Sequence, residues 1–153
     1  MGDAMTGRPR VLVTGSRTFI DAVAIRDALA GVWQKFPGAV LVSGACGHGA
    51  DLLAEQCWTH WGGDVERWPA DWRGPCATSC PPGHRRQGQR GASFCPAAGM
   101  VRNAAMAAAG ADICLAFIRD RSRGATYCAT TAQRAGIPAE IHRYRTDDDH
   151  LTY

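Results

Sequence analysis

Hydrophobic residues along the chain follow two alternating patterns. Short apolar runs rich in β-branched residues predict buried strands, and longer segments with apolar residues every three or four positions predict amphipathic helices. Strands are expected at residues 10–14, 39–43, 64–68, 111–118 and 139–144. Helices are expected at residues 21–36, 50–61, 100–109 and 124–135. Residues 69–98 show neither pattern and are expected to be an irregular insert.

The alternation of strands and helices predicts an α/β fold. Strands that are apolar on both faces form parallel sheets covered by helices, and right-handed crossovers make such sheets doubly wound. We therefore expect a Rossmann-like, doubly wound, mainly parallel five-stranded sheet with helices on both faces. One domain should span residues 10–145, with a disordered N-terminus at 1–9 and a flexible tail at 146–153.

Three predicted strand-to-helix junctions consist mainly of small residues. In doubly wound sheets, ligands bind at the carboxyl ends of the strands, where helix N-termini offer unpaired N–H groups to anions. An alternative is that the glycines only permit tight turns. The candidate residues for phosphate binding are Gly15, Ser16, Arg17, Ser43, Gly44, Gly47, Gly49, Asp51, Gly124, Ala125 and Thr126.

Arg102 and Asn103 complete this candidate site. The pattern places them at the start of the third helix, where a positive charge opposes the helix dipole, so an anionic ligand would explain the arginine. An exposed arginine with no ligand is the alternative. The glycine spacing matches neither the G-x-G-x-x-G dinucleotide motif nor a P-loop. No nicotinamide or flavin cofactor is therefore expected.

The order of several short motifs resembles a known family. The motifs are VLVTGSRTF, LVSGACGHGADLLAEQ, WPADW, AGMVRNAAM, GADICLAF and SRGA followed by AGIP. Together they resemble the SLOG superfamily, in particular its YspA/YpsA-like branch, over about residues 10–145. The resemblance implies a Rossmann-like fold and a sensor or processing module for nucleotide-derived ligands. More distant members include LOG phosphoribohydrolases and DprA-like DNA-binding proteins.

One departure from the LOG enzymes bears on activity. Their phosphate loop ends in a glutamate used for N-glycosidic cleavage, and here the corresponding segment reads Ala125-Thr126-Tyr127-Cys128. We therefore expect binding of a nucleotide or an ADP-ribose-like ligand through its phosphate. One alternative is a LOG-like nucleoside-monophosphate phosphoribohydrolase, in which Asp51 or Asp71 would supply the carboxylate. A second is DprA-like binding of single-stranded DNA.

Charge and composition narrow the choice of partners. The net charge of +3 is too small to indicate nucleic-acid binding by itself. Residues 73–102 nevertheless contain five arginines and no acidic residue, which suits either a solvated loop or a flap that attracts phosphate. No signal peptide and no long apolar run is recognised, so a cytoplasmic protein without a membrane partner is expected. Exposed tryptophans and helices rich in small residues are compatible with a homodimer.

Four residues of the irregular insert have the chemistry of a zinc site. Cys76, Cys80, His84 and Cys95 follow the spacing C-x3-C-x3-H-x10-C, and zinc prefers four thiolate or imidazole ligands. Chance clustering of cysteines is the alternative. Trp68 and Trp72 lie near the end of the third strand, where either could stack on a base or be only a core or interface residue. Three other cysteines, Cys57, Cys114 and Cys128, fall on predicted buried faces.

Overall fold

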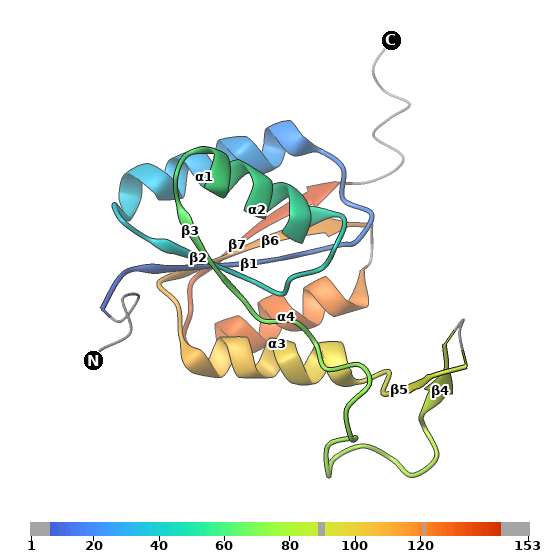
Figure 1. Ribbon diagram of the computed structural model, residues 1–153. Helices are drawn as coiled ribbons and strands as arrows, with labels where there is room; N and C mark the ends of the chain where they lie inside the picture. Colours follow the sequence, from blue (N-terminus) through green and yellow to red (C-terminus); the bar gives the residue numbers. More distant parts are fainter. Residues whose placement is uncertain (1–6, 89–90, 121, 145–153) are drawn as a thin grey trace.

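A five-stranded parallel sheet forms the centre of the protein (Figure 1). The computed structural model describes residues 7–88, 91–120 and 122–144. The strands of the sheet are β1 (Arg10–Gly15), β2 (Val40–Ser43), β3 (Asp64–Arg67), β6 (Ile113–Arg119) and β7 (Ala139–Tyr144). The helices are α1 (Ala22–Lys35), α2 (Ala50–His60), α3 (Ala98–Ala109) and α4 (Arg123–Arg134). The remaining two strands, β4 (Arg86–Gln87) and β5 (Ser93–Phe94), form a separate antiparallel pair.

The strand order of the sheet is β3-β2-β1-β6-β7, and every pairing within it is parallel. The predicted α/β Rossmann-like fold is therefore confirmed. The chain builds β1, β2 and β3 in one direction and then crosses to the other side of β1 to form β6 and β7. The strand order thus reverses between β1 and β6, which is where sheets of this kind bind ligands.

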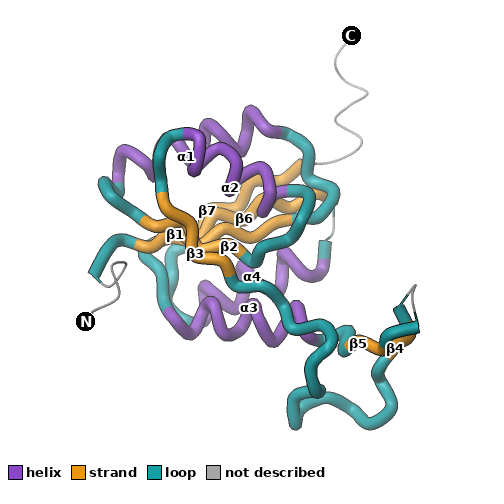
Figure 2. Tube along the Cα trace, viewed as in Figure 1, coloured by secondary structure: helices purple, strands orange, loops and turns teal. Residues whose placement is uncertain are grey.

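Helices cover both faces of the sheet, with α1 and α2 on one face and α3 and α4 on the other (Figure 2). Side chains of β1 alternate between the two cores, as the two-residue period of a strand requires. Val11 and Val13 join the cluster that includes Leu29 of α1 and Trp58 of α2. Leu12 joins the cluster that includes Met106 of α3. Both layers of helices are thus fixed to the sheet by apolar burial.

Several sequence predictions need correction. The segment expected to be irregular contains the short β4–β5 pair, since strands of two residues are too short to show a period. Cys114 and Cys128 are buried as expected, but Cys57 is only partly buried. The expected N-terminal segment 1–9 lies mostly outside the described residues, and the expected tail 146–153 lies entirely outside them. Within the described ranges, no helix is long and apolar enough to cross a membrane.

Candidate functional site

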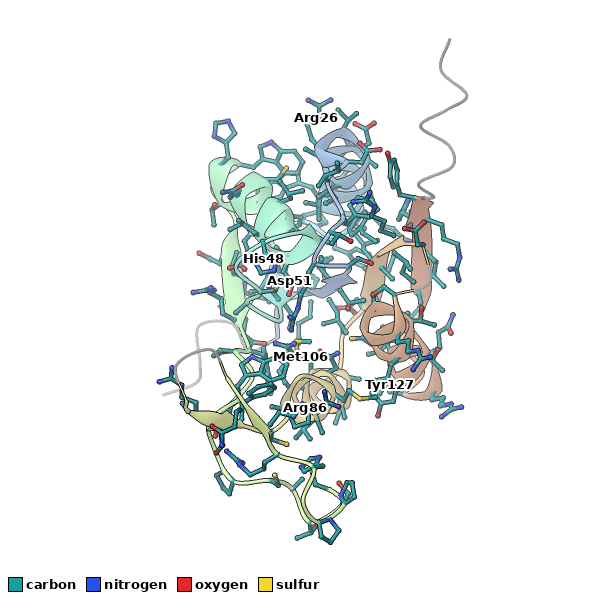
Figure 3. The ribbon with its side chains drawn as sticks, turned by 90° about the vertical axis from the view of Figure 1, so that its right-hand side faces the viewer. Arg26, His48, Asp51, Arg86, Met106 and Tyr127 are labelled. Carbon is teal, nitrogen blue, oxygen red and sulfur yellow. The ribbon has the colours of Figure 1, made fainter. Side chains whose placement is uncertain are left out.

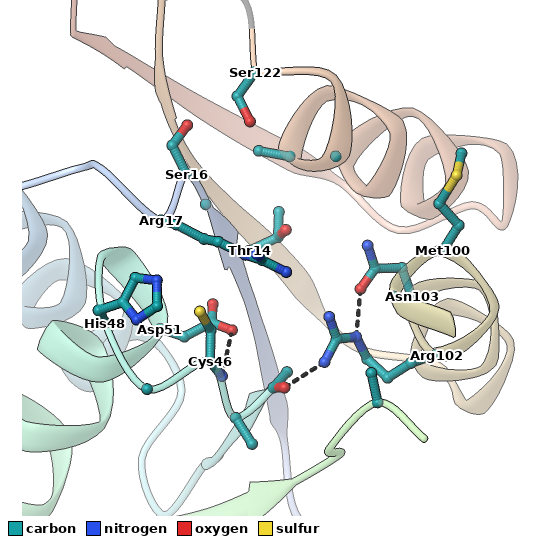
Figure 4. Close-up of a pocket in the computed structure, with 18 of the residues that line it drawn as sticks. Thr14, Ser16, Arg17, Cys46, His48, Asp51, Met100, Arg102, Asn103 and Ser122 are labelled. Atoms are coloured by element: carbon teal, nitrogen blue, oxygen red, sulfur yellow. Dashed lines mark hydrogen bonds between the residues drawn. The ribbon is translucent and has the colours of Figure 1, made fainter. Parts of the chain in front are cut away.

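A pocket of about 1120 Å³ opens at the carboxyl ends of β1, β2 and β6. It lies where the strand order reverses, and the three predicted junctions all contribute to its lining (Figure 4). In the view onto this edge of the sheet, His48 and Asp51 lie above Met106 of α3 (Figure 3). The pocket therefore spans both helical layers. The predicted residues that line it are Gly15, Ser16, Arg17, Gly44, Gly47, Asp51, Arg102, Asn103, Gly124 and Ala125.

Three helix N-termini meet at this pocket, and none of them is capped by a side chain. The N-cap residues of α2, α3 and α4 are Gly49, Ala97 and Ser122, and none makes a side-chain hydrogen bond to its helix. By contrast, Asp21 caps α1, which begins away from the pocket, by accepting a hydrogen bond from the N–H of Ala24 at 3.0 Å. The first turns of α2, α3 and α4 therefore direct backbone donors with partial positive charge at one space.

The first junction is tied to the other two through Ser16. Its N–H donates to the carbonyl of Phe117 in β6 at 2.9 Å, and its carbonyl accepts from the N–H of Ala50 at the start of α2. Its buried hydroxyl accepts from the N–H of Arg119 at 2.8 Å. A Cβ on neighbouring Gly15 would overlap both Ala50 and Phe117, so only glycine permits this close approach. Ser16 thus serves as a structural link between the junctions.

The second junction is held in shape by its own polar groups. Ala45 has a φ of 60°, which an L-residue with a side chain adopts at a cost, and its N–H donates to the hydroxyl of Ser43 at 3.0 Å. The N–H of Cys46 donates to the carboxylate of Asp51 at 3.2 Å. This contact fixes Asp51 against the loop, at the first turn of α2.

The carboxyl group of Asp51 has a raised pKa. Its side chain is buried, and this burial raises the pKa of Asp51 to about 6. The hydrogen bond from Cys46 and the positive charges of Arg102 and Arg17 act in the opposite direction without offsetting burial. The group therefore titrates near neutral pH, as acids in functional pockets often do.

Arg102 occupies a different place in its helix from the one predicted. Because α3 begins at Ala98, Arg102 lies in the second turn and not at the helix start, so the argument from an opposed helix dipole was wrong. Its guanidinium donates to the carbonyl of Gly44 and to the Oδ1 of Asn103 (Figure 4). It also donates to the carbonyl of Trp68 at 3.1 Å. Arg102 thus connects α3 to the second junction, and its charge still faces the pocket.

Two further arginines line the pocket. The guanidinium of Arg17 lies 5.6 Å from the centre of the Trp72 ring, in a cation–π contact, and the Arg17 residue is exposed. Arg119 is the last residue of β6, and its guanidinium donates to the carbonyl of Thr18 at 2.9 Å. Among the described residues, the lining thus has the guanidinium groups of Arg17, Arg102 and Arg119 and the carboxyl groups of Asp51 and Asp120.

Three predicted site residues do not line the pocket. The hydroxyl of Ser43 accepts from the N–H of Ala45 and donates to Glu55, so it supports the loop from behind. Gly49 packs against the backbone of Arg17 with a φ of 75°. The hydroxyl of Thr126 donates to the carbonyl of Ser122 inside α4. All three stabilise the junctions without facing the space between them.

Sequence reasoning missed one wall of the pocket. Trp72, which was only a stacking candidate, lines the pocket together with Phe94 and Pro96 from the irregular insert. Trp68 does not line it, because its ring packs against the core under α3 and its Nε1 donates to Glu66. No periodicity in the insert could have identified this wall, since Trp72 lies 22 positions before Phe94 in the sequence.

The four predicted metal ligands form one cluster. The Sγ atoms of Cys76, Cys80 and Cys95 and the ring nitrogen of His84 all lie within 4.8 Å of one another. Cys95 is buried and the other three are partly buried. This group could hold a metal ion, and three sulfurs with one imidazole are the donors of a closed structural site.

The fold and the pocket define a Rossmann-like α/β protein with a pocket where the strand order of its sheet reverses. Residues 9–74 match the model of the YspA, cpYpsA-related SLOG family. The Gene 61 protein of Mycobacterium phage D29 is 38% identical over 130 residues, which cover 84% of this chain and 92% of that protein. No solved structure matches the chain. The protein belongs to the YspA, cpYpsA-related SLOG family, and the resemblance seen in its motifs is confirmed.

Proposed function

We propose that the protein binds a nucleotide or a nucleotide-derived ligand, such as an ADP-ribose-like molecule, through its phosphate. The observation that carries this proposal is the convergence of three helix N-termini without side-chain caps on one pocket. Backbone N–H groups at such termini bind anions, and each additional terminus adds donors and positive potential. Backbone carbonyls of Ser16 and Cys95 already accept from the N–H groups of Ala50 and Ala98, and a phosphate group would supply acceptors for other N–H groups of these first turns.

The charges in the lining support a phosphate over a neutral ligand. Arg17 is exposed at the first junction, so its guanidinium is accessible to an incoming anion. Arg102 contributes a second positive charge from α3, although several of its donors already serve the protein. Guanidinium groups suit phosphate oxygens because their donors are arranged in a planar fork.

The size and chemistry of the pocket fit a nucleotide better than free phosphate. Its volume of about 1120 Å³ lies just above the usual range of ligand pockets, roughly 300–1,000 Å³. Trp72, Phe94 and Pro96 give it an apolar wall. Such a wall suits a nucleobase, since aromatic rings stack on its faces.

Calorimetric titration tests the proposal with a matched set of ligands. AMP and ADP-ribose should bind, and adenosine should bind at least about tenfold more weakly because it lacks the phosphate. Arg17→Gln should weaken AMP binding by about tenfold, as expected for loss of a charge-assisted hydrogen bond. The control Arg26→Gln removes an equivalent charge from α1, away from the pocket, and should leave the affinity unchanged. Equal affinities for AMP and adenosine would contradict the proposal.

A second candidate activity is hydrolysis of a nucleoside monophosphate at its N-glycosidic bond. Asp51 favours it, because a carboxyl group with a pKa of about 6 inside the pocket has the properties of a general acid or base. Release of free base from AMP, measured by chromatography and lost in Asp51→Asn, would support this activity. AMP binding without base release would restrict the protein to ligand binding.

For the cluster of Cys76, Cys80, His84 and Cys95, we propose zinc as the ion and a structural role. Thiolate and imidazole ligands select zinc over magnesium and calcium, which prefer oxygen. Elemental analysis of protein never exposed to chelators should find about one zinc per chain. Less than a tenth of an equivalent would contradict the assignment.

A further inference from the structure

The metal cluster is built into the loop that forms the apolar wall of the pocket. Cys95, one of the four candidate ligands, lies between Phe94 and Pro96, and both of these neighbours line the pocket. Trp72 lines the same wall and precedes Cys76, another candidate ligand, by four positions in the sequence. A metal ion at the cluster would therefore hold both ends of the wall at once.

This loop has almost no apolar core of its own. Among the described residues of the segment 69–97, only Cys95 is buried. Its regular structure is limited to the two short strands β4 and β5, which project from the body of the protein (Figure 1). A segment that buries so little apolar surface needs another source of stability, and bound metals supply it in small or extended structures.

Two distances within the cluster match those of a tetrahedral zinc centre. With Zn–S bonds of about 2.3 Å and Zn–N bonds of about 2.0 Å, tetrahedral geometry separates two sulfurs by about 3.8 Å and a sulfur from a nitrogen by about 3.5 Å. The Sγ atoms of Cys80 and Cys95 are 3.8 Å apart, and the Sγ of Cys95 is 3.5 Å from the Nε2 of His84. The Cys76–His84 pair, at 2.9 Å, needs only a small outward shift.

Arg85 adds electrostatic support to this centre. Zinc with three thiolates and a neutral imidazole carries one net negative charge, so a nearby cation stabilises it. The guanidinium of Arg85 lies 3.5 Å from the Sγ of Cys76. It also donates to the carbonyl of Gly74 at 2.8 Å and to the carbonyl of Ser93 at 3.2 Å. Arg85 therefore joins the two sides of the loop beside the cluster.

One hydrogen bond connects the cluster directly to the pocket wall. The N–H of Cys95 donates to the carbonyl of Trp72 at 2.8 Å. The Trp72 ring in turn meets the Phe94 ring edge-on, with centroids 6.4 Å apart, and lies beneath the guanidinium of Arg17. Displacement of Cys95 would thus also displace the aromatic pair that faces the ligand space.

We propose that a zinc ion bound by Cys76, Cys80, His84 and Cys95 holds the Trp72–Phe94 wall in place, so that metal occupancy determines whether the pocket is closed on that side. The metal-dependent order of the loop stands on the cluster and its contacts alone. Only the consequence for ligand affinity rests on the proposed function.

Limited digestion with trypsin tests the order of the loop without any ligand. Arg73 and Arg86 are exposed in the loop and are sites for trypsin. In the zinc-loaded protein these bonds should be cleaved slowly, and after zinc removal by a strong chelator they should be cleaved at least about tenfold faster, as for a segment that opens locally. Readdition of zinc should restore protection. Equal cleavage rates with and without zinc would overturn the proposal.

Substitutions separate the metal from general effects of cysteine loss. Cys80→Ser should lose zinc and show fast cleavage in the loop, whereas Cys57→Ser, on α2, should retain both zinc and protection. Cobalt substitution of the wild type should give the visible spectrum of a tetrahedral thiolate site, and Cys80→Ser should not. A disulfide between Cys80 and Cys95 in freshly prepared, metal-free protein, detected by mass spectrometry, would overturn the proposal.

AMP binding with and without zinc tests the consequence for ligand affinity. Loss of zinc should weaken AMP binding by about tenfold or more, because the apolar wall is no longer held. If wild-type protein binds no nucleotide while chelation still exposes the loop, the proposed function fails and the metal-dependent wall stands. If nucleotide binds equally well with and without zinc, the proposed function stands and the link between metal and pocket is wrong.

Discussion

The hydroxyl of Ser16 accepts a hydrogen bond from the backbone N–H of Arg119, 2.8 Å away, although 103 positions separate the two residues. This contact joins the turn after β1 to the end of β6 and so fixes two of the three junctions that surround the pocket. Ser16→Ala would leave a partly buried N–H without its partner, at a cost of about 1–3 kcal/mol. Urea denaturation measures this loss, and Ser79→Ala, on an exposed turn, should change stability by less than about 0.5 kcal/mol.

Replacing Ala45 should stabilise the protein. Ala45 has a φ of 60°, and a side chain in this left-handed region costs about 1–2 kcal/mol. Ala45→Gly relieves the strain but gains flexibility in the unfolded chain, so a net stabilisation of about 0.5–1 kcal/mol is expected. Urea denaturation measures this change in stability. A loss of stability would show that the loop does not hold Ala45 in this conformation.

The pH dependence of stability should report the burial of Asp51. Its folded-state pKa of about 6 exceeds the ordinary value, so the native state keeps a proton that the unfolded state releases. The contribution of Asp51 to stability is therefore present below the ordinary pKa and is lost as the pH rises through about 6. Asp51→Asn should be more stable than the wild type at pH 7.5, by up to about 3 kcal/mol.

The difference in stability between Asp51→Asn and the wild type should shrink as the pH falls from 7 toward 4, because the wild-type carboxyl group becomes protonated. The comparison is made between the variant and the wild type at each pH, so that contributions from other groups cancel. A difference that stays constant across this range would show that Asp51 titrates normally.

The start of α4 offers a variant whose effects on stability and on binding should have opposite signs. Gly124 lines the pocket, and a Cβ there would meet no neighbouring atom. Gly124→Asp places a negative charge at a helix N-terminus and should stabilise the fold by about 0.5–1 kcal/mol. The same charge would occupy the phosphate position and weaken AMP binding by at least about tenfold.

Gly124→Ala is the matched control for that experiment. It should also stabilise α4, since alanine favours helices over glycine, but it should leave AMP binding within about threefold of the wild type because it adds no charge. Tight AMP binding by Gly124→Asp would place the phosphate away from α4.

The alternation of apolar strands and amphipathic helices was sufficient to predict the fold, because burial on both faces of a parallel sheet leaves a clear pattern. The glycine-rich junctions could be predicted to share one edge of the sheet for the same reason. The prediction that Arg102 lies at the start of α3 was wrong. The helix begins with Ala98 and Gly99, which carry no amphipathic signal. The wall formed by Trp72 and Phe94 could not be predicted, since long-range contacts of an irregular loop leave no period in the sequence.

The cluster of Cys76, Cys80, His84 and Cys95, unlike the Trp72–Phe94 wall, could be predicted from the sequence. The four candidate ligand residues could be found from spacing and residue type alone, because few other functions place three cysteines and a histidine so close together. Their relation to the pocket required the structure, which shows Cys95 hydrogen-bonded to Trp72 and flanked by lining residues. The family match at residues 9–74 ends just before this cluster.

In the proposed function, backbone amides of three helix N-termini receive the phosphate of one ligand. The most direct test is a titration of isotope-labelled protein with AMP and with adenosine, followed by two-dimensional amide NMR. AMP should shift the amide signals at the starts of α2, α3 and α4 together, including those of Gly99 and Gly124, and adenosine should leave them largely unchanged. Identical shifts with both ligands, or shifts confined to other parts of the protein, would contradict the claim.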